Sequence, residues 1–166
     1  MRSECQWRSF LQFACDLFLV LLQTTLFLHS SSSLLANQGP ASLTNSITLD
    51  EKRLFALGMI ETGNDDRGIG PAGEISRYQI HPSVWRIYSD SKQYQNPDVA
   101  DLVARQHWNY LTNYFREKTG REPTDFDMYV LWNTRFGFYA RKNFDPRQLS
   151  PLLGDRAQRF VNLVNR

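Results

Sequence analysis

Glu61 is the residue of this chain whose type and position best suit acid–base chemistry. Leu54, Leu57 and Gly58 precede it by seven, four and three residues, so a helix would place all four on one apolar face. Burial on such a face disfavours the charged carboxylate and raises its pKa, as a general acid working near neutral pH requires. We therefore expect Glu61 to donate a proton. The alternative is a glutamate at a helix end that bonds to nearby backbone.

A helix and a glycine-rich loop must position this carboxylate. Thr48 followed by Glu51 forms a capping-box pattern, which predicts the start of the helix. Glycine and proline residues then prevent the helix from continuing through 62–73: Gly63, Gly68, Gly70, Pro71 and Gly73. A chain of this composition can pass close to a ligand, so we expect a cleft between the helix of Glu61 and this loop.

A second carboxylate would decide which reaction follows the proton transfer. A general acid is often paired with a second carboxylate whose environment gives it a different role. Glu74 is the candidate for that second carboxylate. It could also be a surface acid of the loop, or a partner for Arg67 or Arg77. Two further acids of the loop are expected to be solvated: Asp65 and Asp66.

The segment that begins at Glu61 resembles the catalytic segment of the lysozyme-like superfamily, especially that of the soluble lytic transglycosylases. It reads E-T-G-N-D-D-R-G-I-G-P-A-G-E-I-S-R-Y-Q-I-H-P-S-V-W. The family pattern is a Glu followed by Ser or Thr at a helix end, a Gly-rich loop, a G-x-x-G-L-M-Q-I-like segment and often a Pro. Glu61 falls on the family's catalytic acid, and Gln79–Ile80 falls on its Q-I pair. Ser76 stands where a second glycine is usual, and Arg77–Tyr78 replaces the usual Leu-Met.

A second motif lies at residues 131–135, where L-W-N-T-R resembles the family's A-Y-N-A-G. Asn133 is identical, and Arg135 stands in place of the glycine. Tyr129 lies one turn before Asn133 and shares its helix face. The alternative is a buried aromatic helix with an Asn near its C-terminus. The resemblance implies substrate contacts from both motifs: Ser76, Tyr78, Gln79, Ile80, Tyr129 and Asn133.

The resemblance implies an enzyme that cleaves the glycan strands of peptidoglycan, with no metal and no other cofactor. In a lytic transglycosylase Glu61 would act first as acid and then as base, and the product would carry a 1,6-anhydro ring. Glu74 lies five residues before Gln79, where hen-type lysozymes place their second acid, so a hydrolase using both acids is the alternative. A non-catalytic glycan-binding module is a third possibility, although a sugar binder gains little from a buried acid.

The rest of the sequence predicts a mainly helical α+β domain, and the resemblance implies a lysozyme-like fold. Helices are expected at 82–88, from an Asn96 cap to Gly120, after a Thr124 cap, and from Asp155 to Val164. Strand signals are scarce, and a short hairpin between 70 and 80 is the only site for them. His107 is expected to be structural, because no spacing of His, Cys or acids there suits a metal.

The first 36 residues differ from the rest in composition. A weakly basic start, an apolar region from Phe10 to Leu28 and the small residue Ala36 predict a secretory signal peptide, followed by a linker over 37–47 and a catalytic domain over 48–166. An uncleaved membrane anchor and a lipoprotein site at Cys15 are the alternatives. We expect an exported, periplasmic or extracellular protein. The net charge of +2 does not argue for nucleic acid, and it leaves the oligomeric state open.

Overall fold

Helices build the part of the chain that this computed structural model describes, which is residues 47–166. These residues belong to one compact unit, Leu43–Arg166. Its α-helices are α2 (Glu51–Glu61), α3 (Pro82–Tyr88), α4 (Pro97–Thr119), α5 (Asp125–Asn133) and α6 (Pro151–Val164), with the short 3-10 helices η1 (Ala140–Lys142) and η2 (Pro146–Gln148) between the last two. The mainly helical character expected from the sequence is therefore confirmed for the described residues.

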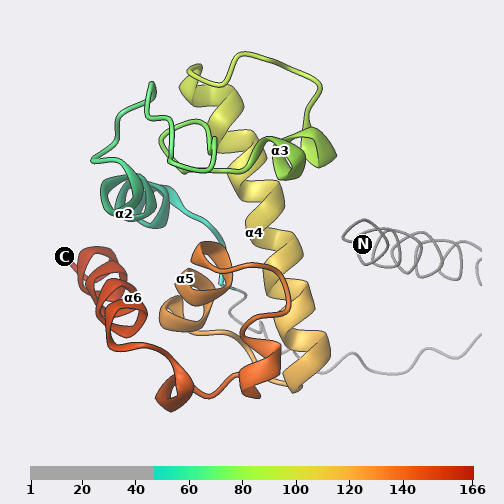
Figure 1. Cartoon of the computed structure of the whole chain (residues 1–166), viewed down its shortest axis with the longest axis vertical. Helices are drawn as coiled ribbons and strands as arrows, with labels where there is room; N and C mark the ends of the chain where they lie inside the picture. Colours follow the sequence, from blue (N-terminus) through green and yellow to red (C-terminus); the bar gives the residue numbers. More distant parts are fainter. Residues whose placement is uncertain (1–46) are drawn as a thin grey trace, which may run out of the picture. The chain divides into compact units, whose positions relative to one another are not determined.

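The long helix α4 is the scaffold on which α3 and α5 pack. Asn96 caps its start by accepting from the backbone N–H of Asp98 and Val99, and Gly120 ends it in the left-handed conformation with φ 69°. Helices α3 and α5 contact α4, while α6 packs against both α5 and α2 (Figure 1). The core between them is rich in large side chains: Trp85, Trp108, Tyr78, Tyr129, Tyr139, Phe115 and Phe160.

Two helix starts differ from the prediction. Asp50, and not the pair of Thr48 and Glu51, caps α2, because its carboxylate accepts from the N–H of Arg53 at 2.9 Å and pairs with the Arg53 guanidinium at 2.7 Å. Helix α6 begins at Pro151, four residues before the predicted start, because Ser150 accepts from the N–H of Leu153. A neighbouring residue thus replaces the predicted capping pair of α2, and a cap that was not predicted starts α6 earlier.

The expected hairpin between residues 70 and 80 is only a single antiparallel bridge. Ile75 and Ile80 exchange two backbone hydrogen bonds of 2.9 Å, and the four residues between them form a tight turn. Ser76 and Gln79 have φ of 63° and 51° there, so the chain reverses within these four residues, and no further strand pairing adjoins the bridge within residues 47–166. Within residues 47–166 the fold is mostly α, and this bridge is all that the structure shows of the predicted strand pairing.

The predicted signal peptide and almost all of the predicted linker lie outside the described residues. Ile47, the last residue assigned to the linker, belongs to the folded part, because its carbonyl accepts from the indole N–H of Trp108 at 3.1 Å. Among residues 47–166, none of the helices combines the length and apolar character that a membrane crossing needs.

Candidate functional site

Glu61 ends helix α2 and turns its side chain into the protein. Leu54, Leu57 and Gly58 are buried on the same face, as predicted. The side chain of Glu61 is only 7% exposed. The absence of a side chain at Gly58 has a local reason, because a Cβ there would collide with the side chain of Asn64, which folds over the end of the helix. An apolar helix face therefore carries a nearly buried carboxylate at its C-terminal end.

Three side chains from two other helices donate hydrogen bonds to this carboxylate. Tyr129 Oη and Asn133 Nδ2 of α5 donate to Glu61 Oε1 at 2.9 and 3.4 Å. Arg156 Nη2 of α6 donates to Glu61 Oε2 at 3.3 Å, and its Nε donates to Tyr129 Oη at 3.1 Å. Tyr129 and Asn133 were predicted to share a face, and the structure brings both to Glu61.

Burial and hydrogen bonding act in opposite directions on this group. Burial raises the pKa of Glu61, whereas the bond from Tyr129, the charge of Arg156 and the bond from Asn133 lower it, and the charge of Glu74 raises it slightly. The net result is a pKa above the ordinary value, because desolvation is the largest effect. Glu61 is thus a carboxyl group that can hold a proton at higher pH than an exposed glutamate.

A buried acid held by a Tyr, an Asn and an Arg is the feature from which a function can be argued. No protein-family model, curated protein or solved structure matches this chain. The functional proposal therefore rests on the chemistry of these side chains and on the sequence resemblance. The arrangement can hold a proton, release it and stabilise the carboxylate that results.

Glu74 lies within electrostatic reach of Glu61 but points into its own loop. Its Oε2 accepts from the N–H of Ala72 at 2.9 Å, and its backbone carbonyl accepts from the N–H of Gly70 at 2.9 Å. A Cβ at Gly70 would collide with both Glu74 Oε2 and Gln79 Oε1, so only glycine lets these two side chains converge there. Neither Arg67 nor Arg77 pairs with Glu74 among residues 47–166.

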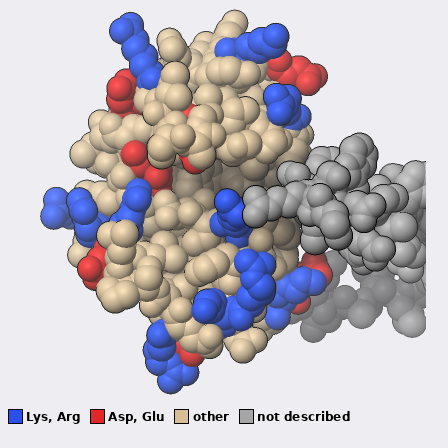
Figure 2. Space-filling view, in the orientation of Figure 1, with Lys and Arg blue, Asp and Glu red and all other residues tan. Residues whose placement is uncertain are grey.

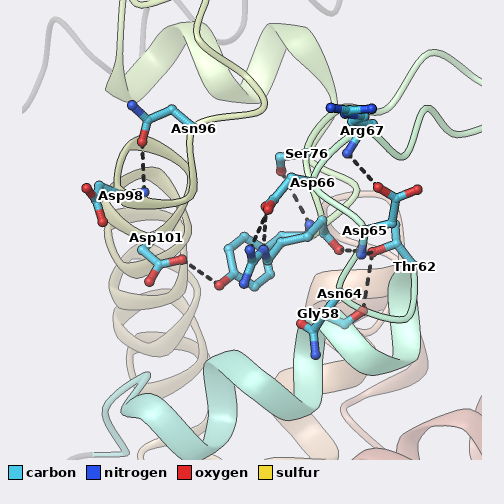
Figure 3. A network of polar contacts seen from close by, with 12 residues as sticks. Gly58, Thr62, Asn64, Asp65, Asp66, Arg67, Ser76, Asn96, Asp98 and Asp101 are labelled. Atoms are coloured by element: carbon cyan, nitrogen blue, oxygen red, sulfur yellow. Dashed lines mark hydrogen bonds and ion pairs between the residues drawn. The ribbon is translucent and has the colours of Figure 1, made fainter.

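The loop after Glu61 is held by polar contacts despite its glycines (Figure 3). Thr62 Oγ1 donates to the carbonyl of Arg77 at 3.0 Å and accepts from the N–H of Asp65 at 3.1 Å. Arg77 forms two bonds with the carboxylate of Asp66, at 2.5 and 2.6 Å. Asp66 was expected to be solvated, and this half-buried ion pair corrects that prediction.

The other residues assigned to substrate binding divide into two groups. Ser76, Tyr78 and Ile80 are buried, and Tyr78 Oη donates to Asp101 Oδ1 of α4 at 2.6 Å (Figure 3). Gln79 is half-buried, and its Nε2 donates to the carbonyls of Gly68 and Ser76 at 3.3 Å each. Their side chains hold the turn and the loop against α4, and their contact with a substrate stays a prediction.

Arg156 is the member of the site that the sequence did not predict. It lies 95 residues after Glu61, so no local spacing relates the two. The sequence offered one signal within α6, which is that Arg156 lies one turn before the apolar Phe160. In the structure Phe160 lies on the buried face of the helix, and its ring centroid is 5.4 Å from that of Tyr129. An arginine at the border of a buried helix face can reach inward with its head group.

No metal centre is assigned in the described part of the chain. Residues 47–166 contain no group of three or more His, Cys, Asp or Glu side chains placed to hold an ion. His107 packs against Trp132 with ring centroids 5.2 Å apart, and its Nδ1 lies 3.2 Å from Tyr88 Oη. Burial lowers the pKa of His107 to about 4, so the ring is neutral at physiological pH.

Proposed function

We propose that this chain cleaves the β-1,4 bond between N-acetylmuramic acid and N-acetylglucosamine in peptidoglycan, with Glu61 as general acid and then general base. One observation carries the proposal: the Glu61 carboxyl is nearly buried, has a raised pKa and is oriented by Tyr129 and Asn133. The resemblance of the segment after Glu61 to lytic transglycosylases names the substrate. The proposal includes a lysozyme-like fold, in which α2, the loop after Glu61 and α5 surround the substrate.

The proposed reaction needs one carboxyl group and no added water. Glu61 gives its proton to the bridging oxygen, the bond from that oxygen to C1 breaks, and the sugar develops oxocarbenium character. The ionised Glu61 then takes the proton of the C6 hydroxyl of the same muramic acid, while O6 bonds to C1. A 1,6-anhydro ring results, and Glu61 is protonated again for the next cycle.

The surroundings of Glu61 suit both steps. Burial favours the neutral form that donates the proton, and the donors Tyr129, Asn133 and Arg156 stabilise the carboxylate left behind. A group that must act as acid and base in one cycle works best when neither form is strongly favoured. The exposed side of Asn133 also leaves this amide able to exchange its bond to Glu61 for one to the substrate.

A hydrolase that uses Glu74 as the second carboxylate is the alternative. Its support is that the charge of Glu74 acts on Glu61. However, the Glu74 carboxylate is bonded to the N–H of Ala72 and occupied in ordering the loop. We therefore favour the reaction that needs Glu61 alone.

The mass of the products released from purified peptidoglycan tests this choice. Transglycosylation predicts 1,6-anhydro ends, about 18 Da lighter than hydrolysed ends because no water is added. A Glu74→Gln variant should then retain most of its activity, because the amide can still accept from the N–H of Ala72. Reducing ends from the wild type, together with a folded but inactive Glu74→Gln, would favour the hydrolase. Retention of the protein on intact peptidoglycan without any release would favour a glycan-binding module.

A further inference from the structure

Three aromatic side chains form a surface that the proposed reaction does not use. Tyr110 and Tyr114 lie one turn apart on α4, and Phe136 follows the end of α5. Tyr110 is 45% exposed and Phe136 is 48% exposed. The ring of Phe136 lies 4.6 Å from that of Tyr114 and 5.8 Å from that of Tyr110, centroid to centroid. We refer to these three rings as the aromatic platform.

Contacts connect the aromatic platform with the acid. Phe136 lies three residues after Asn133, whose amide donates to Glu61. Trp132, the neighbour of Asn133, contacts the ring of His107 at 5.2 Å, and His107 is stacked with Tyr110 at 6.3 Å. The platform therefore lies at the end of a row of aromatic contacts that includes Trp132, the sequence neighbour of Asn133.

Positive charge flanks the aromatic platform. Arg135 precedes Phe136, and Arg141 Nη1 lies 3.3 Å from the position that a Cβ would take on Gly137. Both arginines are exposed, and neither has an acidic partner within residues 47–166. Figure 2 shows Lys and Arg side chains gathered over the lower part of this face, where Figure 1 places the connection between α5 and α6.

We propose that the aromatic platform, with Arg135 and Arg141, binds a carboxylate-bearing glycan strand beyond the cleavage position. The inference rests on the proposed function and extends its site. Exposed rings that neighbouring rings already fix offer contact area at a low cost in side-chain entropy, and they suit the C–H faces of pyranose sugars. Guanidinium groups without partners suit the carboxylates of the peptides that such strands carry. A surface that docks aliphatic side chains would need neither exposed aromatic rings nor guanidinium groups without partners.

Binding to insoluble peptidoglycan in a Glu61→Gln background tests the platform apart from catalysis. A Tyr110→Ala/Phe136→Ala double change should weaken binding roughly tenfold. Phe136→Leu should also weaken it, because it keeps an apolar side chain and removes the ring. Phe55→Ala is the matched control: Phe55 is 59% exposed on α2 and should leave binding unchanged. Tyr110 and Phe136 are about half exposed and contact neighbouring rings, so a modest loss of thermal stability is expected, and a cooperative unfolding transition above the temperature of the binding assay shows that each variant is folded.

Salt dependence tests the role of the arginines. Arg135→Gln/Arg141→Gln should weaken binding several-fold at low salt and reduce its dependence on salt, since the screened charges are removed. Binding to a neutral chitin oligosaccharide should change little. Arg86→Gln, an exposed arginine of α3 that has no ion pair among the described residues, is the control and should behave as the background does.

The outcomes separate this inference from the proposed function. Full binding by the platform variants would overturn the inference even if wild-type protein releases anhydro products. Binding that depends on the platform, in a wild-type protein that releases no fragments, would support the platform and overturn the cleavage proposal. A changed oligomeric state in light scattering, with glycan binding intact, would identify a protein–protein interface and overturn the inference.

Discussion

Glu61 combines a nearly buried side chain with three hydrogen-bond donors, and the balance between them sets its protonation. Burial raises the pKa of this carboxyl, and Tyr129, Arg156 and Asn133 oppose the increase. Arg156 is the charged member of this group and comes from a different helix than the other two. Changing one donor at a time should therefore move the pH dependence of activity in a predictable direction.

Arg156→Gln should shift the alkaline limb of the pH–activity profile to higher pH. The acid step needs protonated Glu61, so activity falls as pH rises through its pKa. The charge of Arg156 lowers that pKa, and its removal lets the pKa rise further. Tyr129 and Asn133 of α5 and Glu74 of the loop, which also act on Glu61, are unchanged. Arg159→Gln, at an exposed position of α6, is the control, and a limb that stays in place or moves to lower pH would contradict this role for Arg156.

Glu61→Gln should stabilise the protein at neutral pH while it abolishes the acid. A raised pKa means that Glu61 favours folding when it is protonated, below its unfolded pKa, and that this contribution is lost as pH rises through the folded pKa. Glutamine stays neutral, and its single oxygen can still accept from Tyr129 and Asn133, while its NH2 group, like the O–H of the protonated acid, faces Arg156. We expect a melting temperature higher by roughly 2–4 °C at pH 7, with the difference vanishing near pH 4. A lower melting temperature at pH 7 would show that the carboxylate is stabilising.

At the scale of the elements, the start of α5 is held by a buried carboxylate that does no chemistry. Asp127 Oδ2 accepts from Arg121 Nη1 at 2.9 Å and from Thr124 Oγ1 at 2.8 Å, and Asp127 Oδ1 accepts from Tyr139 Oη at 2.9 Å. Burial alone would raise the pKa of Asp127, but these bonds outweigh it and hold the pKa below its usual range. The network joins α5 to the segments before and after it.

Asp127→Asn should destabilise the protein by roughly 2–3 kcal/mol at pH 7, because buried donors lose a charged acceptor. A lowered pKa gives stability that is present above the unfolded pKa of about 4 and is lost as pH falls through the folded pKa. The difference from wild type in urea unfolding should therefore shrink as the pH falls below 4. Asp155→Asn, at an exposed position of α6, is the control. A difference that persists undiminished at acidic pH would point to packing and not to charge.

Local signals explain which elements could be predicted from the sequence. The caps at Asn96 and Thr124 each act within their own turn, so the starts of α4 and α5 follow from a few residues. The start of α2 was missed because Asp50 gains from Arg53, which also pairs with Asp125 of a distant helix at 2.6 Å. The tight turn before Ile80 needs positive φ at Ser76 and Gln79, and neither serine nor glutamine predicts that conformation.

The site shows the same limit at the scale of the whole molecule. Asn133 was proposed from the resemblance to the A-Y-N-A-G motif and Tyr129 from its position one turn earlier, whereas Arg156 reaches Glu61 only because α6 packs on α2 and α5. Sequence spacing cannot report a contact between residues 95 positions apart. The exposed aromatic platform was likewise unpredicted, because its rings come from α4 and from the segment after α5 and meet only in the folded protein.

The proposed substrate requires that the chain leave the cytoplasm. We propose that residues 1–36 act as a secretory signal peptide, so N-terminal sequencing of the exported protein should begin near Asn37. The protein is captured through an affinity tag at its C-terminus, which leaves the N-terminus free for sequencing. A full-length, membrane-bound product would contradict removal of this segment and favour an anchor.

Release of soluble fragments from purified peptidoglycan, by wild type and by Glu61→Gln side by side, tests the account most directly. Glutamine keeps the shape of the side chain and its acceptor oxygen but has no proton to give, so the variant should fold, bind the polymer and release almost nothing, at least about 100-fold less than wild type. Retained folding is checked by thermal unfolding. Release at the wild-type rate by the folded Glu61→Gln variant would contradict the assignment of Glu61 as the catalytic acid.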